Sequence, residues 1–168
     1  MLEIFYPDYI YRAVQDIEPG FFKERGIRLA ILDIDNTLVP YTEPDPTPAA
    51  KAFLCRLEQE GVRFCFVSNN GADRVDRFNQ NIGAFYVARA KKPLRAGIRQ
   101  AMQEYRAEAS ETILIGDQIF TDIYGGRRSN ITTVLVEPIE DKETLFFRFK
   151  RRMEKIVLKK YRKGKRDV

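Results

Sequence analysis

The sequence of 168 residues contains no histidine and has two cysteines, Cys55 and Cys65. Without histidine, a catalytic triad or a proton relay built on imidazole is excluded, and so is a metal site made of cysteine and histidine. Acid–base chemistry must therefore come from carboxylates, lysine or tyrosine. Both thiols fall in regular helix or strand patterns, so we expect them to be reduced, as in a cytoplasmic protein.

Long apolar runs are absent as well. No stretch of about 18 apolar residues occurs, so we expect no segment that crosses a membrane. The first seven residues lack the basic start and the apolar stretch of a secretory signal peptide. With a charged fraction of 32%, these features predict an ordinary globular protein of the cytoplasm.

Charge is distributed unevenly along the chain. Residues 142–168 hold twelve Lys or Arg and three Asp or Glu, whereas the whole chain has a net charge of +5, so the remainder is mildly acidic. We expect one domain at 1–140, which begins with a short helix at 8–18 capped by Asp8, and a basic amphipathic helix at 141–168. The basic segment predicts an anionic partner.

Short apolar runs alternate with helical patterns in the rest of the chain. Five runs are typical of buried strands: 28–33, 62–67, 84–87, 112–115 and 132–136. Helical patterns follow the first four of them, at 47–60, 72–80, 93–107 and 120–128. This alternation predicts an α/β fold in three layers, with a five-stranded parallel sheet covered by helices on both faces. Ligands of such sheets bind beyond the carboxyl ends of the strands.

Polar side chains follow four of the five expected strands. In chain order they are Asp33 and Asp35, Ser68 and Asn69, Lys92, and Asp117 with Asp122. Two acids at the end of one buried strand are costly without a cation between them, and a hard divalent metal prefers oxygen ligands. Hydroxyl, ammonium and backbone N–H groups bind phosphate oxygens. The pattern indicates a site for a metal and a phosphate group.

Each of these signals has a structural alternative when it is taken alone. A strand can simply end in polar residues, as at Asp33 and Asp35. Ser68 can cap the next helix, and Asp122 can interact with a helix dipole. A lysine beside proline is usually a solvated surface residue. The order of all of them at successive strand ends favours a functional site.

Taken together, these residues resemble the four motifs of the haloacid dehalogenase (HAD) superfamily of phosphotransferases. The matches are Asp33-Ile34-Asp35-Asn36-Thr37 for the first motif, Ser68 for the second, Lys92 for the third, and Gly116-Asp117 with Asp122 for the fourth. Lys91 is an alternative for the third motif, although the lysine of the family commonly precedes proline. The resemblance covers residues 28–136 and implies a Rossmann-like, HAD-type fold.

The resemblance also implies the chemistry of a Mg²⁺-dependent phosphatase. Asp33 would attack phosphorus and form an aspartyl-phosphate, and Asp35 would serve as general acid and then as general base. Ser68, Asn69 and Lys92 would bind the transferring phosphoryl group. The ligands of Mg²⁺ would be Asp33, the backbone carbonyl of Asp35, Asp117 and Asp122.

The intervals between the motifs indicate the branch of the superfamily. The chain between Asp33 and Ser68, and between Ser68 and Lys92, has room for little more than a loop and one helix, so we expect no cap domain and an open site. The flanking residues narrow the resemblance further: the segment from Pro7 to Ile17, Gly26-Ile27-Arg28 before the first motif, Leu38-Val39 after it, and Gly125-Gly126 after the fourth motif. With them, the sequence is similar to the capless YqeG-type branch (subfamily IIIA), which resembles the mitochondrial phosphatidylglycerophosphate phosphatases. That similarity implies a role in phospholipid biosynthesis, in which phosphatidylglycerophosphate is converted to phosphatidylglycerol at a membrane surface.

The partner of the basic C-terminal segment stays open. Its apolar residues fall on one face of a helix: Phe146, Phe149, Met153, Ile156 and Val157. This face can lie on the inner, anionic surface of a membrane, or it can pack on the domain. The segment can also bind RNA or the ribosome through phosphate contacts. A phosphatase for small soluble phosphate esters is a further alternative.

Overall fold

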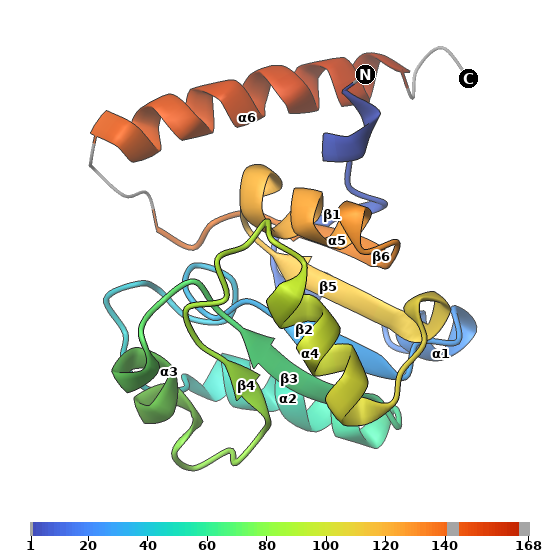
Figure 1. Cartoon of the computed structure of the whole chain (residues 1–168), viewed down its shortest axis with the longest axis vertical. Coiled ribbons are helices and arrows are strands. Elements are labelled where there is room, and N and C mark those ends of the chain that lie inside the picture. Colours follow the sequence, from blue (N-terminus) through green and yellow to red (C-terminus); the bar gives the residue numbers. More distant parts are fainter. Residues whose placement is uncertain (1, 141–144, 165–168) are drawn as a thin grey trace.

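The computed structural model describes residues 2–140 and 145–164, which form a parallel sheet between layers of helices (Figure 1). The strands lie in the order β1-β6-β5-β2-β3-β4, and every neighbouring pair is parallel. The strands are β1 (Tyr9–Tyr11), β2 (Leu29–Leu32), β3 (Arg63–Val67), β4 (Tyr86–Val87), β5 (Thr112–Gly116) and β6 (Thr132–Val136). The predicted α/β fold with three layers is confirmed.

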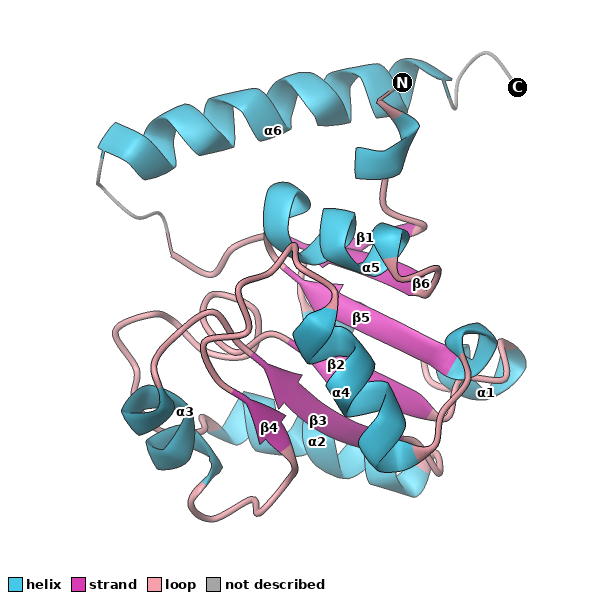
Figure 2. Ribbon diagram, in the orientation of Figure 1, coloured by secondary structure: helices cyan, strands magenta, loops and turns pink. Residues whose placement is uncertain are grey.

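Helices cover both faces of the sheet (Figure 2). They are α1 (Phe21–Glu24), α2 (Pro48–Gln59), α3 (Ala72–Asn79), α4 (Ala96–Tyr105), α5 (Tyr124–Arg128) and α6 (Leu145–Gly164). Side chains of α1, α2 and α3 pack on one face of the sheet, and side chains of α4 pack on the other. The start of α2 is as predicted, because the Thr47 hydroxyl accepts a hydrogen bond from Ala50 N–H at 3.2 Å and Pro48 is its first residue.

Strand β2 is the centre of the structure. It pairs with β3 on one side and β5 on the other. Ala30 and Leu32 point into one core, Leu29 and Ile31 point into the other, and all four are fully buried. A strand that is covered on both faces must be apolar throughout. The first polar residue after this run, Asp33, therefore emerges at the carboxyl edge of the sheet.

The predicted helix at 8–18 is wrong. Residues Tyr9–Tyr11 form β1, which pairs in parallel with β6 and makes the sheet six-stranded rather than five-stranded. Asp8 does not cap a helix: its carboxylate accepts hydrogen bonds from Thr133 N–H and the Thr133 hydroxyl, both at 2.8 Å, and from Arg127 at 2.7 Å. Alternating aromatic and β-branched residues favour a strand, and the open edge of β6 supplies its partner.

The C-terminal helix α6 lies across one end of the molecule, beside the N-terminal segment (Figure 1). Val157 and Glu154 are buried against the domain, and the rings of Tyr161 and Tyr6 are 5.3 Å apart. Met153 and Ile156 are 39% and 48% exposed. The predicted apolar face is therefore divided between the domain and the surface.

Some predictions for the C-terminal segment fall on residues that the structure leaves out. Residues 141–144 and 165–168 lie outside the described chain, as do the side chains of Phe146 and Phe149. The division of the chain at residue 140 stays a prediction. Within residues 2–140 and 145–164, no helix has both the length and the apolar character that a membrane span requires.

Candidate active site

A cavity of about 360 Å³ opens beyond the carboxyl ends of β2 and β3. Six of the seven predicted site residues line it: Asp33, Asp35, Ser68, Asn69, Lys92 and Asp122. The seventh, Asp117, lies with Asp33 and Asp122 in a buried group of carboxylates. The structure therefore brings all seven predicted residues to one edge of the sheet, although the chemical role of each stays a prediction.

Lys92 joins the first and fourth motifs. Its Nζ atom is 2.7 Å from Asp33 Oδ1 and 2.7 Å from Asp122 Oδ1, and its side chain is 2% exposed. Burial lowers the pKa of Lys92, but the nearby charges of Asp122 and Asp33 outweigh this effect and leave the pKa above the ordinary value. The ammonium group thus stays charged. Lys91, the alternative for this motif, is exposed.

The second motif holds this lysine in place. Asn69 Nδ2 donates a hydrogen bond to Lys92 O at 3.1 Å, and Lys92 N–H donates to Asn69 Oδ1 at 2.6 Å. Both polar ends of the Asn69 amide therefore contact the backbone of Lys92. Ser68 is buried, and its hydroxyl accepts a hydrogen bond from Asn70 N–H at 3.1 Å. The predicted contact of Asn69 with phosphate stays a prediction.

Three carboxylates form a compact acidic group. One oxygen from each of Asp33, Asp117 and Asp122 lies within 4.8 Å of the others, and all three residues are buried. Burial raises the pKa of Asp33 to about 8, because Lys92 only partly offsets burial and the charges of Asp122 and Asp117. One lysine cannot balance three buried carboxylates, and their oxygens are the ligands that a hard divalent cation prefers. The group therefore fits such a cation.

The loop after β5 depends on a glycine. A Cβ atom at Gly116 would overlap the carboxyl group of Asp122. That group is turned back toward the loop, where Asp122 Oδ2 accepts a hydrogen bond from Gln118 N–H at 3.0 Å. Asp122 itself belongs to a single π-helical turn, Ile119–Ile123, which places it beside Asp117. Because this turn brings the Asp122 side chain so close to the backbone of residue 116, only glycine fits at that position.

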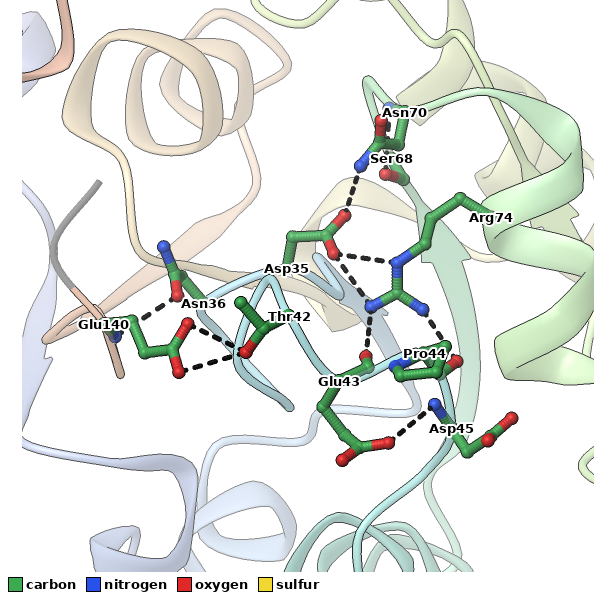
Figure 3. A network of polar contacts seen from close by, with 10 residues as sticks. All are labelled: Asp35, Asn36, Thr42, Glu43, Pro44, Asp45, Ser68, Asn70, Arg74 and Glu140. Atoms are coloured by element: carbon green, nitrogen blue, oxygen red, sulfur yellow. Dashed lines mark hydrogen bonds and ion pairs between the residues drawn. The ribbon is translucent and has the colours of Figure 1, made fainter. Parts of the chain in front are cut away.

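The sequence analysis missed Arg74. Its Nε and Nη2 atoms donate hydrogen bonds to Asp35 Oδ1 at 3.1 and 2.9 Å, and Asn70 Nδ2 donates to Asp35 Oδ2 at 2.8 Å (Figure 3). Arg74 lies within α3, where an arginine is typical of an exposed helix surface. No local pattern predicts its pairing with a residue 39 positions earlier, so only the tertiary structure reveals it.

A second contact missed from sequence ties the segment after β6 to the first motif. Glu140 N–H donates a hydrogen bond to Asn36 Oδ1 at 3.2 Å, and the Glu140 carboxylate accepts one from the Thr42 hydroxyl at 3.1 Å (Figure 3). Asn36 adopts a left-handed backbone conformation with φ of 63°, which asparagine tolerates better than most residues. Glu140 thus contacts the segment after Asp35 at two points, Asn36 and Thr42.

Comparisons with known proteins agree with this geometry. A family model described as HAD-hydrolase-like matches residues 89–145. The probable phosphatase YqeG of Bacillus subtilis (strain 168) is 31% identical over 156 residues, which is 93% of this chain and 91% of that protein. The chloroplastic/mitochondrial phosphatidylglycerophosphate phosphatase 1 of Arabidopsis thaliana is 31% identical over 175 residues, which is 96% of this chain but 50% of that protein.

Solved structures show the same fold at lower identity. The 4-nitrophenylphosphatase of Thermotoga maritima superposes with a TM-score of 0.57 at 15% identity, over 71% of this chain and 89% of that one. An uncharacterized protein from Listeria monocytogenes serotype 4b gives a TM-score of 0.56 at 20% identity, over 70% and 85%. The sequence identity to YqeG over nearly the whole of both chains, together with this fold, shows that the protein belongs to the YqeG-type branch of the HAD-like phosphatases.

Proposed function

We propose that this HAD-like phosphatase is Mg²⁺-dependent, acts through an aspartyl-phosphate on Asp33, and removes the terminal phosphate of phosphatidylglycerophosphate at a membrane surface. The observation that carries the chemistry is the contact of buried Lys92 with both Asp33 and Asp122, beside a cavity large enough for a phosphate group. A nucleophile, a fixed positive charge and a group of metal-binding oxygens thus face one space.

The reaction has two halves. An oxygen of Asp33 attacks the phosphorus, the bond from phosphorus to the ester oxygen breaks, and Asp35 gives its proton to the departing alcohol. Water then attacks the phosphorus while Asp35 takes a proton from it, and the bond to Asp33 breaks to release inorganic phosphate. Lys92 and the Ser68 hydroxyl stabilise the negative charge of the phosphoryl group in both halves.

Asp33, Asp117 and Asp122 would hold Mg²⁺, with the backbone carbonyl of Asp35 as a further ligand. A bound Mg²⁺ ion neutralises charge on the phosphoryl oxygens. Lys92 adds a further positive charge beside these carboxylates, because its Nζ atom contacts both Asp33 and Asp122. The buried carboxylates thereby keep their positions while the phosphoryl group is transferred.

Two observations favour a lipid substrate. The chain between β2 and β3 holds a loop and α2, and the chain between β3 and Lys92 holds α3 and β4, so these intervals carry no cap domain. An open site suits a phosphate on a large or surface-bound molecule. The second observation is the similarity to a plant phosphatidylglycerophosphate phosphatase over 96% of this chain.

The outward side of α6 favours docking on an anionic membrane. Arg152, Lys155, Lys159 and Lys160 are exposed, and the exposed Met153 and Ile156 lie among them. Basic residues beside exposed apolar ones are typical of helices that lie in the interface of a membrane. Each lysine or arginine near an anionic surface adds about 1 kcal/mol of attraction. These residues support peripheral contact with an anionic membrane, and our proposal is that this contact occurs at its inner, cytoplasmic face.

A phosphatase for small soluble esters is the second candidate. A protein named glyceraldehyde 3-phosphate phosphatase, from Pyrococcus abyssi (strain GE5 / Orsay), is 22% identical over 136 residues, which is 76% of this chain and 55% of that protein. The exposed lysines of α6 would then serve solubility or bind RNA, rather than a membrane.

The test is phosphate release in the presence of Mg²⁺ from three substrates: phosphatidylglycerophosphate in mixed micelles, glyceraldehyde 3-phosphate and 4-nitrophenyl phosphate. We expect rapid release from the lipid, which Asp33→Asn abolishes because it removes the nucleophile. Asp73→Asn, an exposed aspartate of α3, is the matched control and should leave the rate unchanged. Release from glyceraldehyde 3-phosphate but not from the lipid would favour the second candidate.

A further inference from the structure

The guanidinium group of Arg74 connects two parts of the chain at the edge of the cavity. It donates two hydrogen bonds to Asp35 Oδ1, at 3.1 and 2.9 Å. It also donates to the backbone carbonyls of Pro44 and Glu43, both at 2.7 Å (Figure 3). One side chain of α3 therefore holds both the first motif and the loop 40–46 that follows it.

Arg74 acts on Asp35 from outside the cavity. The described residues that line the cavity include Asp35 and Tyr41, but Arg74 is not among them. The side chains of Arg74 and Asp35 are 18% and 12% exposed, so water screens their ion pair less than it screens a surface pair. Together with Asn70, which donates to Asp35 Oδ2, the arginine fixes both carboxyl oxygens.

We propose that Arg74 is a positioning residue for phosphoryl transfer, which orients Asp35 so that its proton reaches the departing ester oxygen. After that proton is transferred, Asp35 is a carboxylate, and the same three donors stabilise it. The loop 40–46, held by the same guanidinium, also contributes Tyr41 to the lining of the cavity. This inference rests on the proposed role of Asp35 as general acid.

The next arginine of α3 offers a matched control. Arg77 Nη2 is 3.1 Å from Asp45 Oδ2, and the two side chains are 60% and 57% exposed. Arg77 thus attaches the same helix to the same loop, but its guanidinium donates hydrogen bonds to Asp45 rather than to Asp35. Replacing it removes a contact between the same helix and the same loop, and leaves the donors of Asp35 in place.

The experiment compares kcat/KM for two soluble substrates with different leaving groups, at one Mg²⁺ concentration. Glycerol 1-phosphate has an alkoxide leaving group that needs a proton, whereas the 4-nitrophenolate of 4-nitrophenyl phosphate leaves without one. We expect Arg74→Met to lower kcat/KM about 100-fold for glycerol 1-phosphate and less than about fivefold for the aryl ester, because general acid catalysis contributes on the order of 100-fold or more. Arg77→Met should change neither value.

Two further variants make the result decisive. Arg74→Lys keeps the charge but lacks the planar fork, so we expect a smaller selective loss; it also serves if Arg74→Met does not fold. An equal loss for both substrates, or no loss for either, would overturn the inference. Asp35→Asn separates the role of Asp35 as general acid from the role of Arg74 as its positioning residue. If Asp35→Asn does not lower kcat/KM selectively for glycerol 1-phosphate, the proposed role of Asp35 is wrong. If Asp35→Asn shows this selective loss and the Arg74 variants do not, only the inference about Arg74 fails.

Discussion

At the scale of single residues, the two thiols illustrate how far burial changes chemistry. Cys65 lies in β3 and is fully buried, and burial raises the pKa of its thiol to about 12. Cys55 lies on the exposed side of α2. Thiolate is the reactive form of cysteine, so a raised pKa means less thiolate at any given pH. Of the two cysteines, we expect only Cys55 to react readily.

This expectation can be tested with a thiol reagent at pH 8. We expect one equivalent of thiol per chain to react in the native protein and two in denaturant. Cys55→Ser should abolish the native reaction, and Cys65→Ser should leave it unchanged. Rapid native labelling of Cys55→Ser would contradict the burial of Cys65.

At the scale of structural elements, the turn after β5 depends on a close contact between two parts of the fourth motif. Gly116→Ala places a Cβ atom against the carboxyl group of Asp122, so the π-helical turn must shift. We expect Mg²⁺ affinity to fall by about tenfold or more, the scale seen when groups that orient metal ligands are displaced. Isothermal titration with Mg²⁺ measures this loss independently of catalysis.

Gly71→Ala is the control for this substitution. Gly71 has φ of −67°, and an added Cβ atom there would meet nothing within 4 Å. Its Mg²⁺ affinity should match that of the wild type. Equal affinities for Gly116→Ala and the wild type would show that Asp122 is not a ligand, or that the turn adapts without loss.

The edge strand β1 depends on Asp8. Its carboxylate accepts hydrogen bonds from Thr133 N–H, the Thr133 hydroxyl and Arg127. Asp8→Ala leaves these donors without that acceptor, and we expect a loss of about 2 kcal/mol in the free energy of unfolding, measured by urea denaturation. Asp16→Ala, at an exposed aspartate nearby, should cost less. A similar loss for both variants would argue against a special role for Asp8.

At the scale of the whole molecule, α6 has two sides with different roles. Val157 and Glu154 face the domain, and Ile119 N–H donates a hydrogen bond to Glu154 Oε1 at 3.0 Å. Because Ile119 begins the turn that carries Asp122, the inner side of α6 contacts the segment next to the acidic group. The lysines of the outer side remain available to a partner.

Reversing charge on the outer side should separate docking from chemistry. We expect Lys155→Glu with Lys159→Glu to weaken binding to vesicles of anionic lipid by about 30-fold or more, because each lysine contributes about 1 kcal/mol. Hydrolysis of 4-nitrophenyl phosphate should not change. The control pair, Lys23→Glu with Lys51→Glu, carries the same charge change elsewhere on the surface. Equal vesicle binding by both pairs would refute docking through α6, and binding to RNA should then be measured.

Much of the fold and the site could be predicted because the signals are local. Apolar runs that alternate with helical patterns determined the layers, and the polar residues at their ends determined the candidate site. The helix at 8–18 was wrong because apolar residues at helical spacing there also suit a strand followed by a turn. Only the free edge of β6 made the strand the better solution.

The sequence by itself determined the order of four motifs at the ends of successive strands, since each motif depends on its neighbours in the chain. The tertiary structure alone decided which distant side chains meet: Arg74 with Asp35, and Glu154 with Ile119. It also decided which side of α6 is covered. These contacts depend on how helices pack on the sheet, and the free energy of packing is shared among segments that no local pattern connects.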